Sequence, residues 1–359
     1  MKKIILLALF LRVITIIFSH NIINYDLISY LKVGELISKK INIYPEVAKN
    51  HYPYFPLYLY LQMIPFIIKK FIVFIDPILF FKIVNIFFDL LNLYLVYLIS
   101  NKNVNNALIY GLNPITILIS CFHGQFDVIV IFFLLLSLYL FIKKNDEILA
   151  LLSFSLAITL KHWPIIFIFP VIKKIKNKKY LSLIPILPIM FTIIYLLIFK
   201  SKIFDILYPI ISYRSLFSGW GFGKLIYLLF YSRFDQPPIY LQKIFLIFFS
   251  CFLLLYSWFL REKNLIMYFL KILVFFYCFT FGFSIQYLSW FVPFLIILKP
   301  KFFKIIIANT TIYLFINYFS WYNKNISISN NVQIFFSLFL WLNFFLLLIY
   351  LHKKRLKTI

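Results

Sequence analysis

The side chains of this sequence best suited to chemistry are two carboxylates that lie next to apolar runs. Asp26 lies in a polar, aromatic insert after the first apolar run, and Asp127 comes shortly after His123 and Gln125. A carboxylate can act as a general base that removes the proton from an attacking hydroxyl group. Asp26 is therefore the candidate catalytic residue. The segment 123–127 supplies candidate substrate contacts, which are His123, Gln125 and Asp127.

Asp26 also has an ordinary structural interpretation. Apolar residues recur at helical spacing from Leu27 to Ile37, which predicts an amphipathic helix on the membrane surface with Asp26 near its N-terminus. An Asp at a helix start accepts hydrogen bonds from free backbone N–H groups and stabilises the helix by about 1 kcal/mol. The two roles are compatible, and the spacing alone does not choose between them.

Three basic side chains are candidates for holding an anionic substrate group. Lys161 and His162 lie in one tight turn between apolar runs, and Arg214 lies in a later polar loop. Arg can bind a phosphate through two parallel hydrogen bonds, whereas Lys acts as a point charge. Each of these residues alone is also consistent with an ordinary interfacial position. Together on one face they predict a pocket for a phosphate or diphosphate.

An aromatic strip follows in the same insert. Pro53 and Pro56 disfavour helix at the residues before them and keep the segment His51–Leu57 extended. Such a strip at the membrane interface suits a polyisoprenoid chain or a sugar ring, and Tyr54 is its candidate substrate contact. An ordinary interfacial aromatic belt would have the same composition.

The elements that must position these residues are membrane helices. The chain of 359 residues is 64% hydrophobic and 13% charged, whereas soluble domains average about 25% charged residues. We predict an all-α integral membrane protein that forms a single transmembrane domain over residues 1–359. A span needs about 20 residues, which predicts about 12 transmembrane helices with a range of roughly 10–13. The apolar runs begin near residues 4, 79, 106, 128, 147, 163, 181, 239, 266, 287, 303 and 333.

The distribution of charge predicts how these helices are oriented. Short segments between alternate apolar runs hold about half of the 36 Lys and Arg residues, which is the pattern of cytoplasmic loops. Both termini are then cytoplasmic, and the candidate site faces outward. The first outer loop, 20–78, carries the surface helices, and 200–238 is the second long outer loop. The same pattern explains the net charge of +25 without nucleic-acid binding.

One apolar run contains a polar face of its own. Lys82, Asn85 and Asp89 are spaced so that they share one side of a helix, and Arg12 interrupts the first apolar run. Ionisable groups inside a membrane are costly unless they are paired. The spacing therefore predicts a buried ion pair or hydrogen-bonded cluster.

The sequence carries no signal for a metal or a cofactor. Cys121, Cys251 and Cys278 lie in or beside apolar runs without metal-ligand spacing. Nothing resembles a glycine-rich nucleotide loop, which disfavours a nucleotide-sugar donor. A carboxylate, a set of basic residues and an aromatic strip instead suggest glycosyl transfer from a lipid-phosphate sugar, with the basic groups stabilising the phosphate that leaves.

Short motifs along the chain support this interpretation. They are Asp26-x3-Tyr30-x3-Gly34, Asn42-x-Tyr44, Tyr52-x-Tyr54-x-Pro56-Leu57, Asn113-Pro114, His123-Gly124-Gln125-Phe126-Asp127, Lys161-x2-Pro164 and Gln286-Tyr287-x2-Trp290-x2-Pro293. In their order along most of the chain they resemble motifs of the GT-C superfamily of multispanning glycosyltransferases, in its mannosyltransferase-like branch. Gln286, at the outer start of a late apolar run, is a further candidate substrate contact.

The resemblance implies an inverting glycosyltransferase in which Asp26 is catalytic. The implied donor is a polyprenyl- or dolichyl-phosphate hexose such as mannose. The implied acceptor is a lipid-linked glycan or another acceptor at the outer membrane face. The alternatives are a lipid-sugar flippase, a polysaccharide polymerase or a transporter, which are also multispanning. Transporters tend to show internal repeats, and none is visible here.

Overall fold

The structure, a computed structural model, describes residues 1–213, 216–217, 220–230, 239–322 and 330–353. Most of these residues are helical. The two strands found among them, β1 (Leu216–Phe217) and β2 (Gly282–Phe283), pair antiparallel. The chain forms two compact units, one of Met1–Ile165 with Ile175–Tyr213 and one of Ile166–Lys174 with Arg214–Ile359. The single transmembrane domain over residues 1–359 remains a prediction.

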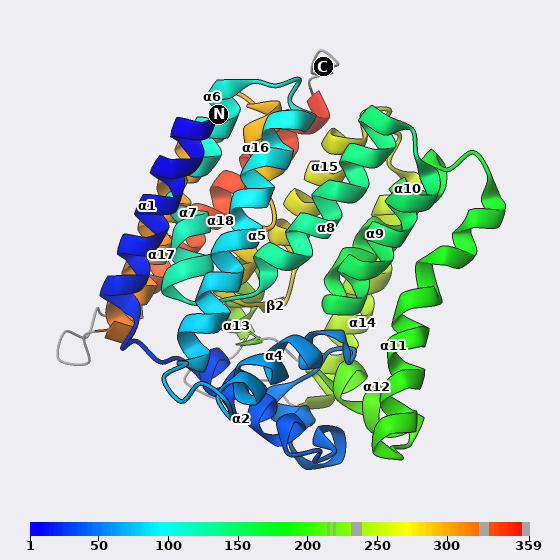
Figure 1. Ribbon diagram of the computed structural model, residues 1–359. Helices are drawn as coiled ribbons and strands as arrows, with labels where there is room; N and C mark the ends of the chain where they lie inside the picture. The colour runs from blue at the N-terminus through cyan, green and yellow to red at the C-terminus, as the bar shows by residue number, and fades with distance from the viewer. Residues whose placement is uncertain (214–215, 218–219, 231–238, 323–329, 354–359) are drawn as a thin grey trace. The chain divides into compact units, whose positions relative to one another are not determined.

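The first unit is built around a long central helix, α5, which packs against α1, α6 and α8 (Figure 1). The row continues outward, because α8 packs on α9 and α9 packs on α11. The helices of this row are α1 (Lys2–Ser19), α5 (Pro77–Ile99), α6 (Val104–Gly111), α7 (Pro114–Ile117), η2 (Leu118–Phe122), α8 (Asp127–Tyr139), η3 (Leu140–Lys144), α9 (Glu147–Leu160), η5 (Lys178–Ser182), α11 (Leu183–Phe199) and α12 (Ile203–Ser212).

Local sequence explains where several of these helices begin. Asp76, Asn103, Asn113 and Asp146 each accept a hydrogen bond from a backbone N–H in the first turn of the helix that follows. Such residues satisfy N–H groups that have no partner within the helix. Pro77 and Pro114 directly follow two of these caps, where a missing N–H costs nothing.

The insert after α1 forms short helices that lie across one end of this row (Figure 1). They are α2 (Tyr25–Ser38), η1 (Tyr44–Ala48), α3 (Lys49–His51) and α4 (Leu57–Ile68), and α2 packs on α4. Gly34 permits the close approach of these two helices, because a Cβ there would lie 2.5 Å from the backbone oxygen of Gln62. The predicted surface helix from Leu27 to Ile37 is confirmed as a helix.

The second unit is built around α15, nearly all of whose side chains are buried. α15 packs against α13, α14 and α18, and α18 also packs against α17. The helices in or entering this unit are η4 (Trp163–Phe167), α10 (Ile168–Lys174), α13 (Gly221–Phe230), α14 (Ile239–Phe259), α15 (Leu265–Phe279), η6 (Ile285–Ser289), α16 (Val292–Leu298), α17 (Phe303–Tyr322) and α18 (Asn330–Lys353).

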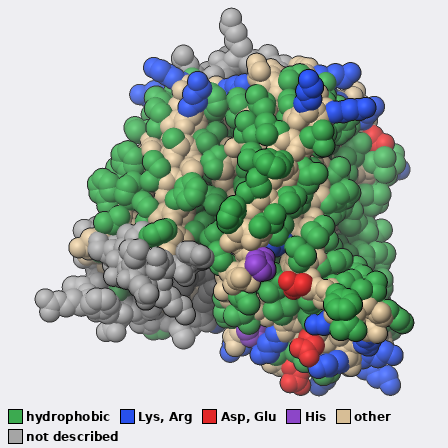
Figure 2. All heavy atoms as spheres, turned by 60° about the vertical axis from the view of Figure 1, so that its left-hand side comes forward, with side chains coloured by type: hydrophobic (Ala, Val, Ile, Leu, Met, Phe, Trp, Pro, Cys, Tyr) green, Lys and Arg blue, Asp and Glu red, His purple; other side chains and the backbone are tan. Residues whose placement is uncertain are grey.

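The helices have the composition of a membrane-embedded protein, as predicted. On the face drawn in Figure 2, apolar side chains form a band with charged side chains towards its two ends. A helix begins within a few residues of each of the twelve predicted starts, yet most of these helices are short. Four described segments are long and apolar enough to cross a membrane, namely Pro77–Ile99, Lys178–Phe199, Tyr240–Phe259 and Asn331–Lys353. The bent pair Val104–Gly111 and Pro114–Phe122 makes a fifth if the pair is counted as one span. The number of about twelve spans remains a prediction.

Candidate active site

Asp26 lies in the first turn of α2, but it is not the residue that caps the helix. The cap is Asn24, whose Oδ1 accepts a hydrogen bond of 3.0 Å from the backbone N–H of Leu27. The other side of the same amide, Nδ2, donates to the backbone oxygen of His123 at 2.7 Å. The hypothesis that Asp26 is the N-cap is therefore wrong, since Asn24 already serves that role.

The carboxylate of Asp26 instead pairs with His123. The Nε2 atom of His123 lies 3.0 Å from Oδ2 of Asp26. The His123 side chain is buried, whereas the Asp26 side chain keeps 35% of its surface exposed. The pair thus joins a buried imidazole to a carboxylate that a solute can reach.

A second layer of hydrogen bonds holds this pair. The amide of Gln125 lies 3.4 Å from Nε2 of His123 and also hydrogen-bonds Asp26. The hydroxyl of Tyr30 donates to Oε1 of Gln125 at 3.0 Å. Gly124 adopts a φ of +82°, a backbone conformation that residues other than glycine rarely adopt. A tight turn between His123 and Gln125 therefore brings both side chains to α2.

The second carboxylate has a different environment. Asp127 lies in the first turn of α8, is fully buried, and accepts a charge-assisted hydrogen bond of 2.8 Å from Nζ of Lys161. Lys161 follows the end of α9, and its ammonium also lies 4.9 Å from the ring centroid of Phe126 and 5.4 Å from that of Tyr54. The positive charge of Lys161, which was predicted to contact a phosphate, is thus neutralised by the buried carboxylate of Asp127. The structure gives Asp127 no exposed surface with which to meet a sugar.

Tyr54 and His162 lie beside this ion pair. The backbone oxygen of Tyr54 accepts a 2.6 Å hydrogen bond from Tyr44, and the two rings of Tyr54 and His162 are 6.3 Å apart. Burial and the neighbouring charge of Lys161 lower the pKa of His162 to about 4. The imidazole is therefore neutral at pH 7. It can exchange hydrogen bonds with a substrate, but it does not supply the positive charge predicted for it.

Electrostatics link the two parts of the site. Burial alone would raise the pKa of Asp26, but the hydrogen bond and charge of His123, helped by Lys161, lower it below its ordinary value. Asp26 is therefore ionised at neutral pH and able to accept a proton. Phe126 lies between the two parts, with its ring 5.8 Å from that of Tyr30 and 5.5 Å from that of Tyr54.

Two of the predicted residues lie outside the described part of the first unit. Arg214 lies outside the residues that the structure describes. Gln286 belongs to the second unit, where it is buried in η6. Within the described residues, no group of three or more His, Cys, Asp or Glu side chains is placed to hold a metal ion.

Three residues of the site were not predicted as site residues. Tyr30 lies four residues after Asp26, so helical spacing places both on one side of α2 and could have identified it. Asn24 as the cap follows from the preference of Asn for that position. The third is Phe126, which stacks on Tyr58 at 3.7 Å between centroids and carries no signal distinguishing it from other aromatic residues.

Seven of the predicted residues thus lie in one connected set of contacts in the first unit: Asp26, Tyr54, His123, Gln125, Asp127, Lys161 and His162. Comparison with known proteins adds no assignment. No protein-family model matches the chain, and no curated protein matches it either.

Proposed function

We propose that this protein is an inverting glycosyltransferase. It moves a hexose, mannose-like as the resemblance implies, from a polyprenyl-phosphate donor to a lipid-linked glycan or another acceptor. The observation that carries the proposal is the partly exposed carboxylate of Asp26, held by His123 beside the pair of Asp127 and Lys161. A general base must be ionised and within reach of the acceptor. Asp26 is ionised at neutral pH, and its partly exposed side chain can be approached by an acceptor hydroxyl.

The proposed reaction is a single displacement. Asp26 takes the proton of the acceptor hydroxyl as its oxygen attacks the anomeric carbon. The bond from that carbon to the donor phosphate breaks, and polyprenyl phosphate leaves with the electron pair. Attack opposite to the leaving group inverts the anomeric configuration. His123 holds the orientation of the carboxylate.

The proposal includes the orientation predicted from the charges. The site is on the extracytoplasmic face, both termini are cytoplasmic, and the shorter apolar helices enter the membrane along with the long ones to make about twelve membrane segments. This arrangement suits a lipid-linked donor, since the surface helices α2 and α4 lie beside the start of a long apolar helix, α5.

The test is the Asp26→Asn variant in proteoliposomes supplied with a radiolabelled polyprenyl-phosphate hexose and a lipid-linked acceptor. Loss of a general base typically slows a reaction by about 10²–10⁴-fold, so we expect transfer to fall by that factor. Glu35→Gln is the matched control, because Glu35 lies on the same helix but pairs only with the exposed Lys39 in the described contacts. Full transfer by Asp26→Asn would refute the assignment. Translocation of the lipid without any covalent product would support the flippase alternative.

A further inference from the structure

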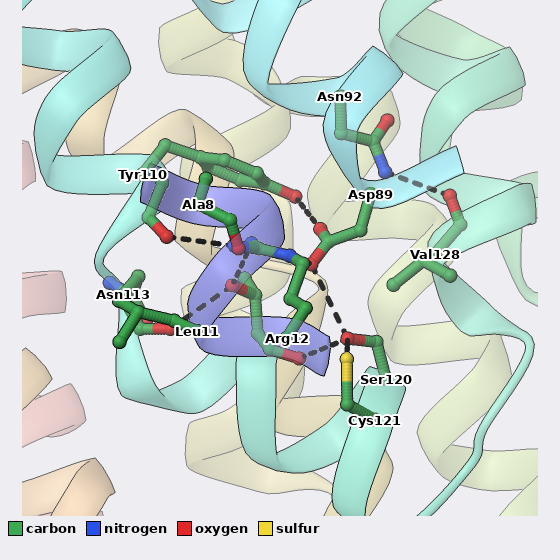
Figure 3. A network of polar contacts seen from close by, with 12 residues as sticks. Ala8, Leu11, Arg12, Asp89, Asn92, Tyr110, Asn113, Ser120, Cys121 and Val128 are labelled. Carbon is green, nitrogen blue, oxygen red and sulfur yellow. Dashed lines mark hydrogen bonds and ion pairs between the residues drawn. The ribbon is translucent and has the colours of Figure 1, made fainter. Parts of the chain in front are cut away.

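A second polar network lies deep among the apolar helices of the first unit (Figure 3). Arg12 of α1 and Asp89 of α5 are both fully buried, with 2.8 Å between Nη2 and Oδ2. The hydroxyls of Tyr110 and Ser120 also donate to Asp89, at 2.8 Å and 3.3 Å. A buried ion pair adds little net stability, because the cost of removing both charges from water offsets their attraction. Stability alone therefore does not account for this network.

The network surrounds a stretch of irregular backbone. The helix breaks at Asn113-Pro114, and α6 meets the α7–η2 segment at an angle of 42°. Proline lacks an N–H group, so a break of this kind leaves carbonyl oxygens without helical partners. In a membrane such groups must be satisfied within the protein. Arg12 meets this need at Gly111, whose backbone oxygen accepts from Nη1 at 2.8 Å.

Side chains of α1 and α5 also hold the second half of the bend. Asn85 donates to the backbone oxygen of Ser120, and Ser19 donates to that of Cys121, each at 3.3 Å. Lys82 in turn fixes Ser19, because its ammonium donates to the backbone oxygen and the hydroxyl of Ser19 at 2.8 Å and 3.1 Å. The predicted polar face of α5 is thus confirmed as a hydrogen-bonded cluster.

This held segment ends at the candidate site. Leu118–Phe122 is a π-helix, and the backbone N–H of His123 closes its last turn by donating to the oxygen of Leu118 at 2.8 Å. The bend and the wide turn together set the direction in which the His123 side chain leaves the helix. π-helical turns inside apolar helices often occur at functional sites.

We propose that Arg12, Asp89 and Lys82 are positioning residues for the site, because they fix the bent α6–η2 segment that aims His123 at Asp26. In the described contacts they do not touch Asp26. The catalytic consequence rests on the proposed function. The geometric claim does not, and it can be measured without turnover.

The experiment replaces the buried pair as a unit. In the Arg12→Met/Asp89→Leu double variant no unpaired charge is left behind, so folding is expected to survive, while the hydrogen bonds to Gly111 and Ser120 are lost. The matched control is Lys271→Met/Glu262→Leu, which removes a 2.7 Å ion pair from the second unit. Ser19→Ala is a milder second variant, which keeps every charge and loses the two bonds of the Ser19 hydroxyl, to Cys121 and from Lys82.

The first readout is the pKa of the Asp26 carboxyl group, followed by ¹³C NMR of aspartate-labelled protein in nanodiscs. We expect it to rise towards its ordinary value in the double variant and less in Ser19→Ala, because the contact with His123 loosens. It should not change in the control. The second readout is sugar transfer, which should fall about 100-fold in the double variant, as a misplacement of about 1 Å can cause.

The outcomes separate the two proposals. An unchanged Asp26 pKa in both Arg12→Met/Asp89→Leu and Ser19→Ala would overturn the positioning role. If the pKa moves but Asp26→Asn still transfers sugar, the positioning role stands and the general-base assignment of Asp26 fails. If the pKa moves but the unmodified protein transfers no sugar, the positioning role stands and the glycosyltransferase proposal fails. Should the double variant not fold, Ser19→Ala alone decides by the same pKa measurement.

Discussion

At the scale of single residues, the site assigns different roles to its two carboxylates. Asp26 is partly exposed and pairs with an imidazole, whereas Asp127 is buried and pairs with an ammonium group. Only the exposed carboxylate can meet an acceptor hydroxyl without breaking a buried ion pair. In the proposed reaction, this difference leaves proton transfer to Asp26, while Asp127 holds Lys161 in position.

The lowered pKa of Asp26 predicts a specific pH dependence. Since the folded pKa lies below the unfolded value, the ionised pair adds stability above the unfolded pKa, and this stability is lost as pH falls through the folded pKa.

His123→Ala removes the main contact that lowers the pKa of Asp26. We expect the acidic limb of the transfer-rate profile to move to higher pH in this variant. His51→Ala is the control, and an acidic limb that does not move in His123→Ala would contradict the assignment.

The buried pair of Asp127 and Lys161 makes a second prediction. Lys161→Met removes the ammonium group that pairs with the fully buried carboxylate of Asp127. Breaking a buried ion pair in this way typically costs about 3–5 kcal/mol of unfolding free energy. Asp127→Leu/Lys161→Met removes both charges and should regain most of that loss. Denaturant unfolding of both variants in detergent measures the difference. A double variant no more stable than the single one would show that the ion pair is not what the single variant disrupts.

At the scale of the helices, the contact between α2 and α4 determines where Asp26 lies. Gly34→Ala would place a Cβ 2.5 Å from the backbone oxygen of Gln62 and 2.6 Å from the ring of Phe66. Backbone cannot rotate away as a side chain can, so α2 must shift, at a cost of about 1–3 kcal/mol. We expect a lower unfolding temperature and slower transfer, with Ser38→Ala on the same helix as control. An unfolding temperature equal to that of the control would show that the helices need no close approach.

The helices and much of the site could be predicted from the sequence, whereas most partners could not. Apolar runs mark the helix starts because burial in lipid requires continuous apolar stretches. Asp89 was predicted to lie in a buried cluster from the spacing on α5 alone. Its partner, Arg12, belongs to α1. Which residues of two helices pair depends on how the helices pack, and residue spacing within one helix does not predict this packing. For the same reason, Lys161 was assigned to a phosphate although it meets Asp127.

At the scale of the whole molecule, the proposed reaction depends on the orientation in the membrane, because it decides which pool of lipid-linked sugar the site could meet. Ser38, at the end of α2, and Lys176, before α11, belong to the same unit, and Figure 1 shows that α2 lies at the end of this unit opposite to the start of α11. The excess of Lys and Arg in the segment that contains Lys176 predicts that this end is cytoplasmic.

Cysteine labelling of intact cells tests this orientation. Cys251 is exposed and is first replaced by Ser, whereas Cys121 and Cys278 are buried and remain in place. A membrane-impermeant maleimide should then label Ser38→Cys from outside, and label Lys176→Cys only after the membrane is opened. The reverse pattern would place Asp26 in the cytoplasm, where a soluble nucleotide sugar is also within reach. That result would remove the argument from topology for a lipid-linked donor. It would not affect the proposed general-base role of Asp26.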